Sequence, residues 1–248
     1  MKNFIKCQTA SRGLAAIFSL SLLLLANFSL AAGFSVSPIM VNLSADKKVV
    51  SLKVHNSSNQ PTAVQAELMD WRQQDGKDIH QVVTRDLLVS PPIFTISPGD
   101  TQVIRVGLRR PLDLKQELSY RLFLQEIPSA IPDNFQGLRV VMRVGLPVFV
   151  EPAQVRTNAD LKWKIRQSNT GDLILHAENQ GNSHAKLTEL RLKFPNGQEL
   201  VQRGNFYILP GSQRKWSIAS KMAHLSGITV TLVIKNQGKT VTSELRLE

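Results

Sequence analysis

The chain has 248 residues, with 30 lysine and arginine residues against 19 aspartate and glutamate residues, and a single cysteine. This length accommodates one large domain or two of about 110 residues, each able to fold on its own apolar core without a disulfide or a metal. A hydrophobic content of 42% with a charged content of 20% excludes a largely disordered protein. The formal net charge of +11 is compatible with an anionic partner such as nucleic acid, a membrane surface or a peptide carboxylate, and also with the ordinary solvated surface of a basic β-protein.

The first 31 residues have the three parts of a secretory signal peptide. A head with three basic residues and no acidic one precedes the apolar run 14–25, and residues 29–31 show the small-x-small pattern of a signal-peptidase site. Because the apolar run is shorter than the ~20 residues of a transmembrane helix, we expect cleavage after Ala31 and export, not a membrane anchor. Cleavage lowers the net charge from +11 to +8 and removes Cys7, so the exported chain must rely on its apolar core. Export also disfavours nucleic acid as the partner.

Period-two alternation of apolar and polar residues predicts a series of short strands after the signal peptide. Turn signals separate these strands: Asn-Ser-Ser-Asn at 56–59, Asp-Gly at 75–76, Pro-Pro at 91–92 and Ser-Pro-Gly-Asp at 97–100. About seven short strands in this span indicate a β-sandwich of immunoglobulin size, and the absence of a Cys-Trp-Cys spacing excludes an antibody-type domain. The clearest strands are predicted at 49–56, 62–68, 101–108, 120–125 and 138–146.

A second set of strands begins after residues 148–151, which we interpret as an extended connector because prolines bracket them on both sides. Asn-Gly and Pro-Gly turn signals recur between the strands of this second set. We therefore predict an all-β protein with two immunoglobulin-like β-sandwich domains in series, at 32–151 and 152–248. Strands of the second domain are predicted at 160–165, 173–178, 186–194, 198–201, 213–218, 227–234 and 240–247.

The sequence contains no recognisable catalytic or metal-binding pattern. Its five histidines are scattered and form neither an H-E-x-x-H motif nor a close pair, which disfavours a zinc site. It has no G-x-S-x-G elbow and no glycine-rich phosphate loop. We therefore predict a protein that is not an enzyme and uses no metal or cofactor. The alternative is a secreted carbohydrate-binding β-sandwich, which clustered tryptophans would favour, but Trp71, Trp163 and Trp216 lie far apart along the chain.

Several local motifs, read together with the signal peptide and the two sandwiches, point to a known family. Over residues 34–248 the chain resembles the PapD-like periplasmic chaperones of pilus assembly. Within that family, segments 85–92 and 105–111 are most similar to the archaic branch that serves spore-coat-type and biofilm fimbriae. The motifs that carry the resemblance are Ser90-Pro91-Pro92-Ile93-Phe94, Ser97-Pro98-Gly99, Gln102-Val103-Ile104-Arg105, residues 120–128 from Tyr120 to Pro128, and Tyr207-Ile208-Leu209-Pro210-Gly211.

The resemblance implies a function in fimbria assembly in the periplasm. Family members hold their two domains in a boomerang, cap pilin subunits, and deliver them to an outer-membrane usher without ATP or any cofactor. Pilin subunits and the usher are therefore the expected partners, and nucleic acid is not. A structural subunit of the fibre itself would instead be a single incomplete sandwich of about 100–150 residues.

One predicted strand carries four alternating apolar residues: Leu138, Val140, Met142 and Val144. Period two places all four on one face of the strand. Alternation alone allows two interpretations, namely that they face the core of their own domain or that they line an open edge suited to strand addition. The resemblance implies the second interpretation, in which this strand is donated to an incomplete pilin subunit. The interleaved Val141 is expected to face the domain core.

A second expected contact is with the C-terminal carboxylate of the pilin. The best-known branch binds it with two basic residues, but the aligned positions here are Met40 and Pro147, which carry no charge. Arg121 and Arg143 lie on the two predicted strands that should border the cleft, and they are the candidate anchors. Each arginine is also compatible with an ordinary solvated position on a strand.

The resemblance also concerns the joint between the domains. The best-known members carry an arginine in the connector that pairs with an acidic residue of the first domain. Here the connector position is Glu151, and Glu126 matches the acidic partner. We therefore expect this interdomain ion pair to be absent.

Overall fold

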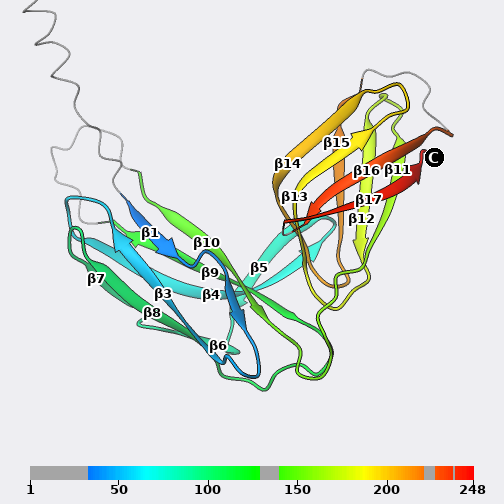
Figure 1. The fold of residues 1–248 in the computed structure, drawn as a ribbon. Coiled ribbons are helices and arrows are strands. Elements are labelled where there is room, and N and C mark those ends of the chain that lie inside the picture. The colour runs from blue at the N-terminus through cyan, green and yellow to red at the C-terminus, as the bar shows by residue number, and fades with distance from the viewer. Residues whose placement is uncertain (1–32, 129–139, 221–226, 237) are drawn as a thin grey trace, which may run out of the picture.

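The computed structural model describes residues 33–128, 140–220, 227–236 and 238–248, without the side chains of residues 82, 83 and 236. The described residues form 17 β-strands and no helix, so nothing in this part of the chain could cross a membrane as a helix. Strands β1 to β10 form one domain and β11 to β17 a second, and the two meet at an angle as the arms of a bent molecule (Figure 1). The predicted all-β architecture with two sandwiches is confirmed. The predicted signal peptide lies outside the described residues.

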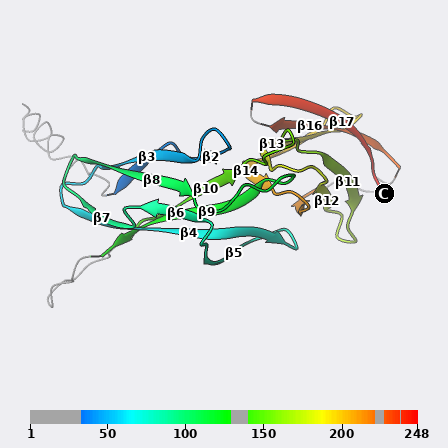
Figure 2. The same ribbon diagram turned by 90° about the horizontal axis from the view of Figure 1, so that it is seen from below.

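The first domain is a sandwich of two sheets, whose layers are separated in the view of Figure 2. One sheet has the order β1-β3-β8-β6 and the other the order β2-β10-β9-β4-β5, with β7 also paired to β4. The strands of the first sheet are β1 (Phe34–Ser37), β3 (Val49–Asn56), β8 (Thr101–Leu108) and β6 (Leu87–Ser90). Those of the second are β2 (Val41–Leu43), β10 (Arg143–Val150), β9 (Leu118–Ile127), β4 (Thr62–Gln74), β5 (Lys77–Val83) and β7 (Ile93–Ile96).

The second domain repeats this construction with fewer strands. A three-stranded sheet in the order β11-β12-β15 packs against a four-stranded sheet in the order β14-β13-β16-β17. The strands of the first sheet are β11 (Leu161–Gln167), β12 (Leu173–Asn179) and β15 (Gln213–Ile218). Those of the second are β14 (Glu199–Ile208), β13 (Ala185–Lys193), β16 (Thr229–Asn236) and β17 (Lys239–Arg246).

Period-two alternation produces a separate apolar core in each domain. In β3, for example, Val50, Leu52 and Val54 are buried while the residues between them are more exposed. Trp163 and Trp216 also belong to a core: their rings stack at 5.9 Å, and Trp216 is only 7% exposed. Trp216 is thus buried and Trp163 partly buried, which disfavours the exposed aromatic surface that the carbohydrate-binding alternative requires.

The predicted boundaries of β10 were wrong, and two other predicted strands are longer in the structure, because β4 continues to Gln74 and β14 to Ile208. Residues 148–150 are not a connector but the end of β10, where they pair with β9 on one side and with β2 on the other. Val148 and Val150 are fully buried in the core of the first domain, and this burial explains why the strand continues past Pro147. The predicted beginning of the strand also differs, because regular pairing starts at Arg143 and Leu138 lies outside the described residues.

A structural repeat relates the two domains. Each places a fully buried asparagine at the end of a strand, and its side-chain amide donates a hydrogen bond to the last residue of the strand before a Pro-Gly turn. The glycine of that turn, at φ +74° or +70°, donates its N–H to the backbone carbonyl of the same asparagine. The corresponding sets are Asn56 with Ile96 and Gly99, and Asn179 with Ile208 and Gly211.

Candidate functional site

The N-terminal half of β10 is an open sheet edge. β10 pairs with β9 along its whole length, whereas the parallel pairing with β2 covers only Val148–Val150. The first strand, β1, cannot cover the rest because it pairs with β3 in the opposite sheet. Residues 143–147 therefore have a strand neighbour on one side only among the described residues. Such an edge offers backbone N–H and C=O groups to an added strand.

The predicted apolar face runs along this open edge. Leu146 is 4% exposed in the core, Val144 and Met142 are half-buried against the rim of that core, and Val140 is 77% exposed. The same face thus leaves the core of the domain and becomes accessible as the chain is followed back toward residue 140. Val141 does not face the core as expected but is 39% exposed, because it lies before the regular part of β10.

Arg121 lies on β9, directly opposite Pro147 of β10. Its guanidinium carbon is 4.8 Å from the centre of the Trp71 ring, and the side chain is half-buried. Burial lowers the pKa of Arg121, and the nearby Asp78 carboxylate opposes that shift; the group remains charged at neutral pH. No described carboxylate lies within ion-pair distance of Arg121, and Asp78 acts on its charge only from further away, so a partly desolvated and unpaired cation borders the open edge.

Arg143, the second candidate, has a different environment. It is exposed at the start of β10, and its guanidinium carbon lies 4.2 Å from the centre of the Phe123 ring. Gly145 lies between the two arginines, and a β-carbon there would be 3.0 Å from Phe123 and 3.2 Å from Arg121. The absence of a side chain at Gly145 leaves room for the side chains of Phe123 and Arg121 beside β10. The structure therefore brings Arg121 and Arg143 onto one face, with only Arg121 sheltered.

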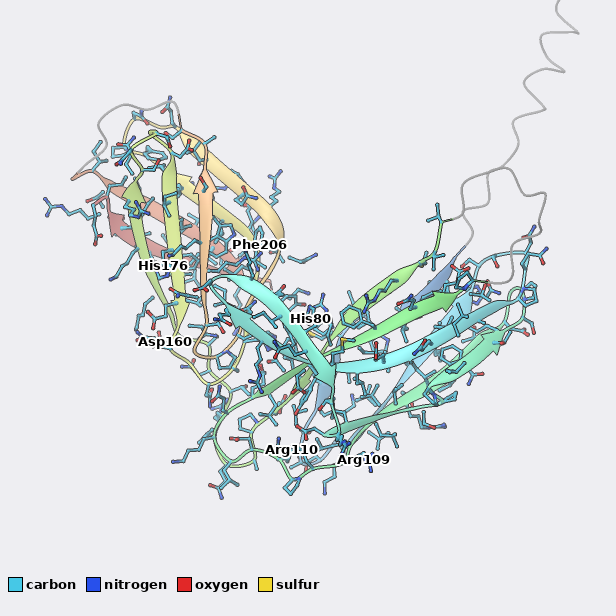
Figure 3. All side chains as sticks on the ribbon, turned by 180° about the vertical axis from the view of Figure 1, so that it is seen from behind. His80, Arg109, Arg110, Asp160, His176 and Phe206 are labelled. Atoms are coloured by element: carbon cyan, nitrogen blue, oxygen red, sulfur yellow. The ribbon has the colours of Figure 1, made fainter. Side chains whose placement is uncertain are left out.

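His80 of β5 joins this face and was not indicated by the sequence. Its ring packs at 5.3 Å against Phe123, and it lies at the bend between the two domains (Figure 3). Burial and the positive charges of Arg121 and Arg143 lower the pKa of His80, while Asp78 opposes the shift. The face is thus positively charged at neutral pH even with His80 neutral.

Met40 shows why one expected cation is missing. Its side chain packs on an apolar cluster at the domain joint, formed by Trp71 and Phe149 of the first domain and Leu209 of the second. An apolar side chain suits this contact, although Glu117 and Glu151 line a cavity together with Met40. A cavity of about 430 Å³ beside Met40 is also lined by Lys239 of β17, a cation from the second domain that the sequence did not indicate.

Polar contacts at the joint replace the ion pair that the sequence excludes. The side-chain oxygen of Gln73 accepts the N–H of Leu209 at 2.9 Å, and its nitrogen donates to the carbonyl of Tyr207 at 2.9 Å. The buried Glu117 carboxylate lies 2.8 Å from Nδ1 of His184, whose ring stacks on Phe149 at 3.6 Å. The hydrogen bonds and the Glu117–His184 contact join residues more than 60 positions apart, a separation at which no local sequence pattern operates.

Glu126 and Glu151, the two residues of the expected ion pair, are separate in the structure. Glu126 accepts a hydrogen bond from the backbone of Met142, and Glu151 is exposed. Neither forms an ion pair with a described residue. The same part of the chain holds no group of three histidine, cysteine or acidic residues arranged to bind a metal ion.

Comparison with known proteins gives consistent matches. Residues 33–156 match the family described as "Pili and flagellar-assembly chaperone, PapD N-terminal domain". The "Chaperone protein LpfB" of Salmonella typhimurium is 25% identical over 190 residues, which cover 75% of this chain and 78% of that protein. Among solved structures, the CsuC-CsuE chaperone–tip subunit pre-assembly complex of Acinetobacter baumannii has a chain that matches with a TM-score of 0.65 at 22% identity, covering 88% of this chain and 100% of that one. The SafA pilin–SafB chaperone complex of Salmonella enterica gives a TM-score of 0.61 at 16% identity, covering 87% and 96%.

Proposed function

The chain belongs to the family of pili and flagellar-assembly chaperones, and from this premise we propose that it captures pilin subunits in the periplasm and delivers them to an outer-membrane usher. The known complexes of similar fold pair a chaperone with a pilin or with a tip subunit, which supports a pilin-like partner. The chain acts as a binding protein without catalysis, metal or cofactor.

The open edge of β10 is the observation that carries this proposal. A strand of the pilin adds to residues 143–147 through backbone hydrogen bonds, which provide affinity for any extended partner. The accessible face of Val140, Met142 and Val144, together with Leu138, fills the groove of a sandwich that lacks its own final strand. Because this face continues into the buried Leu146, the added strand joins its core to the core of the chaperone.

Arg121 is the anchor for the C-terminal carboxylate of the pilin. A sheltered guanidinium that forms no ion pair within its own chain gains more from a two-pronged carboxylate contact than an exposed one, because its own solvation is already reduced. Arg143 lies on the same face but is exposed, so it contributes as a weaker second cation.

Copurification from a periplasmic extract tests the proposal directly. The full chain with a C-terminal affinity tag is expected to retain a pilin-sized protein, and N-terminal sequencing of the retained chaperone is expected to begin at Ala32. Recovery without any such partner, combined with retention on soluble sugars, would instead favour the carbohydrate-binding alternative. A retained chaperone that begins at Met1 would contradict export by a cleaved signal peptide.

A further inference from the structure

We infer that Gln73 is a positioning residue that fixes the second domain against the first and, through Asp78 and Trp71, holds Arg121 in place. The role of Gln73 between the domains stands on the contacts alone. The role in placing Arg121 rests on the proposed function, in which Arg121 binds a carboxylate. The two parts can therefore be tested separately.

The side chain of Gln73 acts as a strand neighbour for the second domain. It accepts from the N–H of Leu209 and donates to the carbonyl of Tyr207, the two groups on either side of Ile208. These are the groups that a paired strand would use, so one carboxamide replaces one residue of an added strand. A carboxylate can only accept and an ammonium can only donate, so the contact requires an amide.

The second hydrogen of the same amide nitrogen connects Gln73 to Asp78 and, through it, to Trp71. Gln73 Nε2 donates to Oδ1 of Asp78 at 2.7 Å, and Nε1 of Trp71 donates to the same oxygen at 3.1 Å. Both hydrogens of the Gln73 amide nitrogen are donated, and its oxygen accepts one hydrogen bond. A reversed amide would place its oxygen against a carbonyl and a carboxylate, neither of which can donate a hydrogen bond. Asp78 thereby fixes Gln73 and Trp71 relative to each other.

Trp71 is the residue in this series of contacts that touches Arg121 directly. Its ring is 3% exposed in the apolar cluster at the joint, and the guanidinium lies over its face at 4.8 Å. The tip of the β4–β5 hairpin also reaches the second domain (Figure 1), where a β-carbon on Gly76 would be 3.8 Å from the backbone of Arg214 in β15. The orientation of the second domain is thus transmitted to Arg121 through Gln73, Asp78 and Trp71.

Gln73→Glu is the sharpest test because it keeps the size of the side chain and the acceptor for Leu209 while removing both donated hydrogen bonds. The matched control is Gln74→Glu, which adds the same charge at the exposed neighbouring position. Calorimetry of the full chain is expected to show wild type and control with coupled melting of the two domains and Gln73→Glu with separated transitions. An unchanged melting profile in Gln73→Glu would overturn the inference that Gln73 fixes the second domain against the first.

Capture of two forms of one pilin tests the placement of Arg121. Wild type is expected to bind a pilin with a free C-terminal carboxylate roughly tenfold more tightly than the same pilin with an amidated C-terminus. Gln73→Glu is expected to lose most of this preference, as Arg121→Ala does, whereas a general loosening would weaken both forms equally. Separated transitions with the preference intact would overturn the positioning role. If wild type binds both forms of the pilin equally, the carboxylate anchor of the proposed function is overturned. The calorimetry would still decide whether Gln73 fixes the two domains against each other.

Discussion

Replacing Val140 with aspartate should weaken strand capture strongly and leave the chaperone folded. Val140 is 77% exposed, so its loss removes little from the core of the first domain. Surface substitutions of this kind usually change the free energy of unfolding by less than about 0.5 kcal/mol. Leu146 on the same face is 4% exposed, and the equivalent change there should unfold the domain.

The size of the expected binding loss follows from the same exposure. Burying a valine side chain completely contributes about 1.5–3 kcal/mol. Since most of the Val140 side chain is still accessible, roughly 1–2 kcal/mol of that gain remains available to a partner. A carboxylate in an apolar groove adds a desolvation cost, so Val140→Asp should weaken pilin binding by more than about tenfold.

The matched control is Val141→Asp at the next residue, which is also exposed and is not one of the four residues of the predicted apolar face. Biolayer interferometry with a purified pilin should show weakened binding for Val140→Asp and near wild-type binding for Val141→Asp, while thermal melting of both variants stays near wild type. Equal binding losses in the two variants, or no loss in either, would refute the assignment of this face to the partner.

The remaining predictions concern charged groups. Arg121→Ala should weaken capture by about 1.5–3 kcal/mol and Met40→Ala by much less, because only the first removes a charged hydrogen bond; equal affinities in the same assay would contradict the anchor. Burial lowers the pKa of His80 in the folded chain below its ordinary value of 6.5. Just below pH 6.5 the unfolded chain therefore binds more protons than the folded chain, and the free energy of unfolding decreases as the pH falls. His80→Gln should therefore show a smaller drop in Tm between pH 7.5 and 5. Hydrogen bonds from basic neighbours, first among them Arg191, lower the pKa of Glu189 to about 2, so its contribution is present above 4.5 and lost toward pH 2. Glu189→Gln should melt below wild type at pH 7 and approach it near pH 2 in a pH series of thermal melts.

Alternation of apolar residues was sufficient to predict most strands and the two-sandwich architecture. It failed at β10, where Pro147 indicated the start of a connector although it lies inside the strand. Proline is tolerated in a sheet where a strand has a neighbour on one side only, and the sequence does not show which strands lie at an edge.

The candidate site was predictable only in part. The apolar face of β10 follows from a local period and could be named, and so could the two arginines on neighbouring strands. What separates Arg121 from Arg143 is burial against Trp71, which depends on how β4 and β9 pair. The role of Gln73 could not be predicted, because its partners in the second domain lie 134 and 136 residues further along the chain.

The two buried asparagines have a consequence for the order in which the molecule becomes competent. Asn56 and Asn179 each take the partners described above from their own domain, so each sandwich closes with its own residues. Domains generally fold as units, and a chain exported by an N-terminal signal peptide enters the periplasm with its first domain ahead of its second. The first domain can therefore complete its open strand edge before the backbone groups of Tyr207 and Leu209, which Gln73 contacts, are in place. Under the proposed function, strand pairing at β10 would then become possible before Arg121 is held in position for a carboxylate.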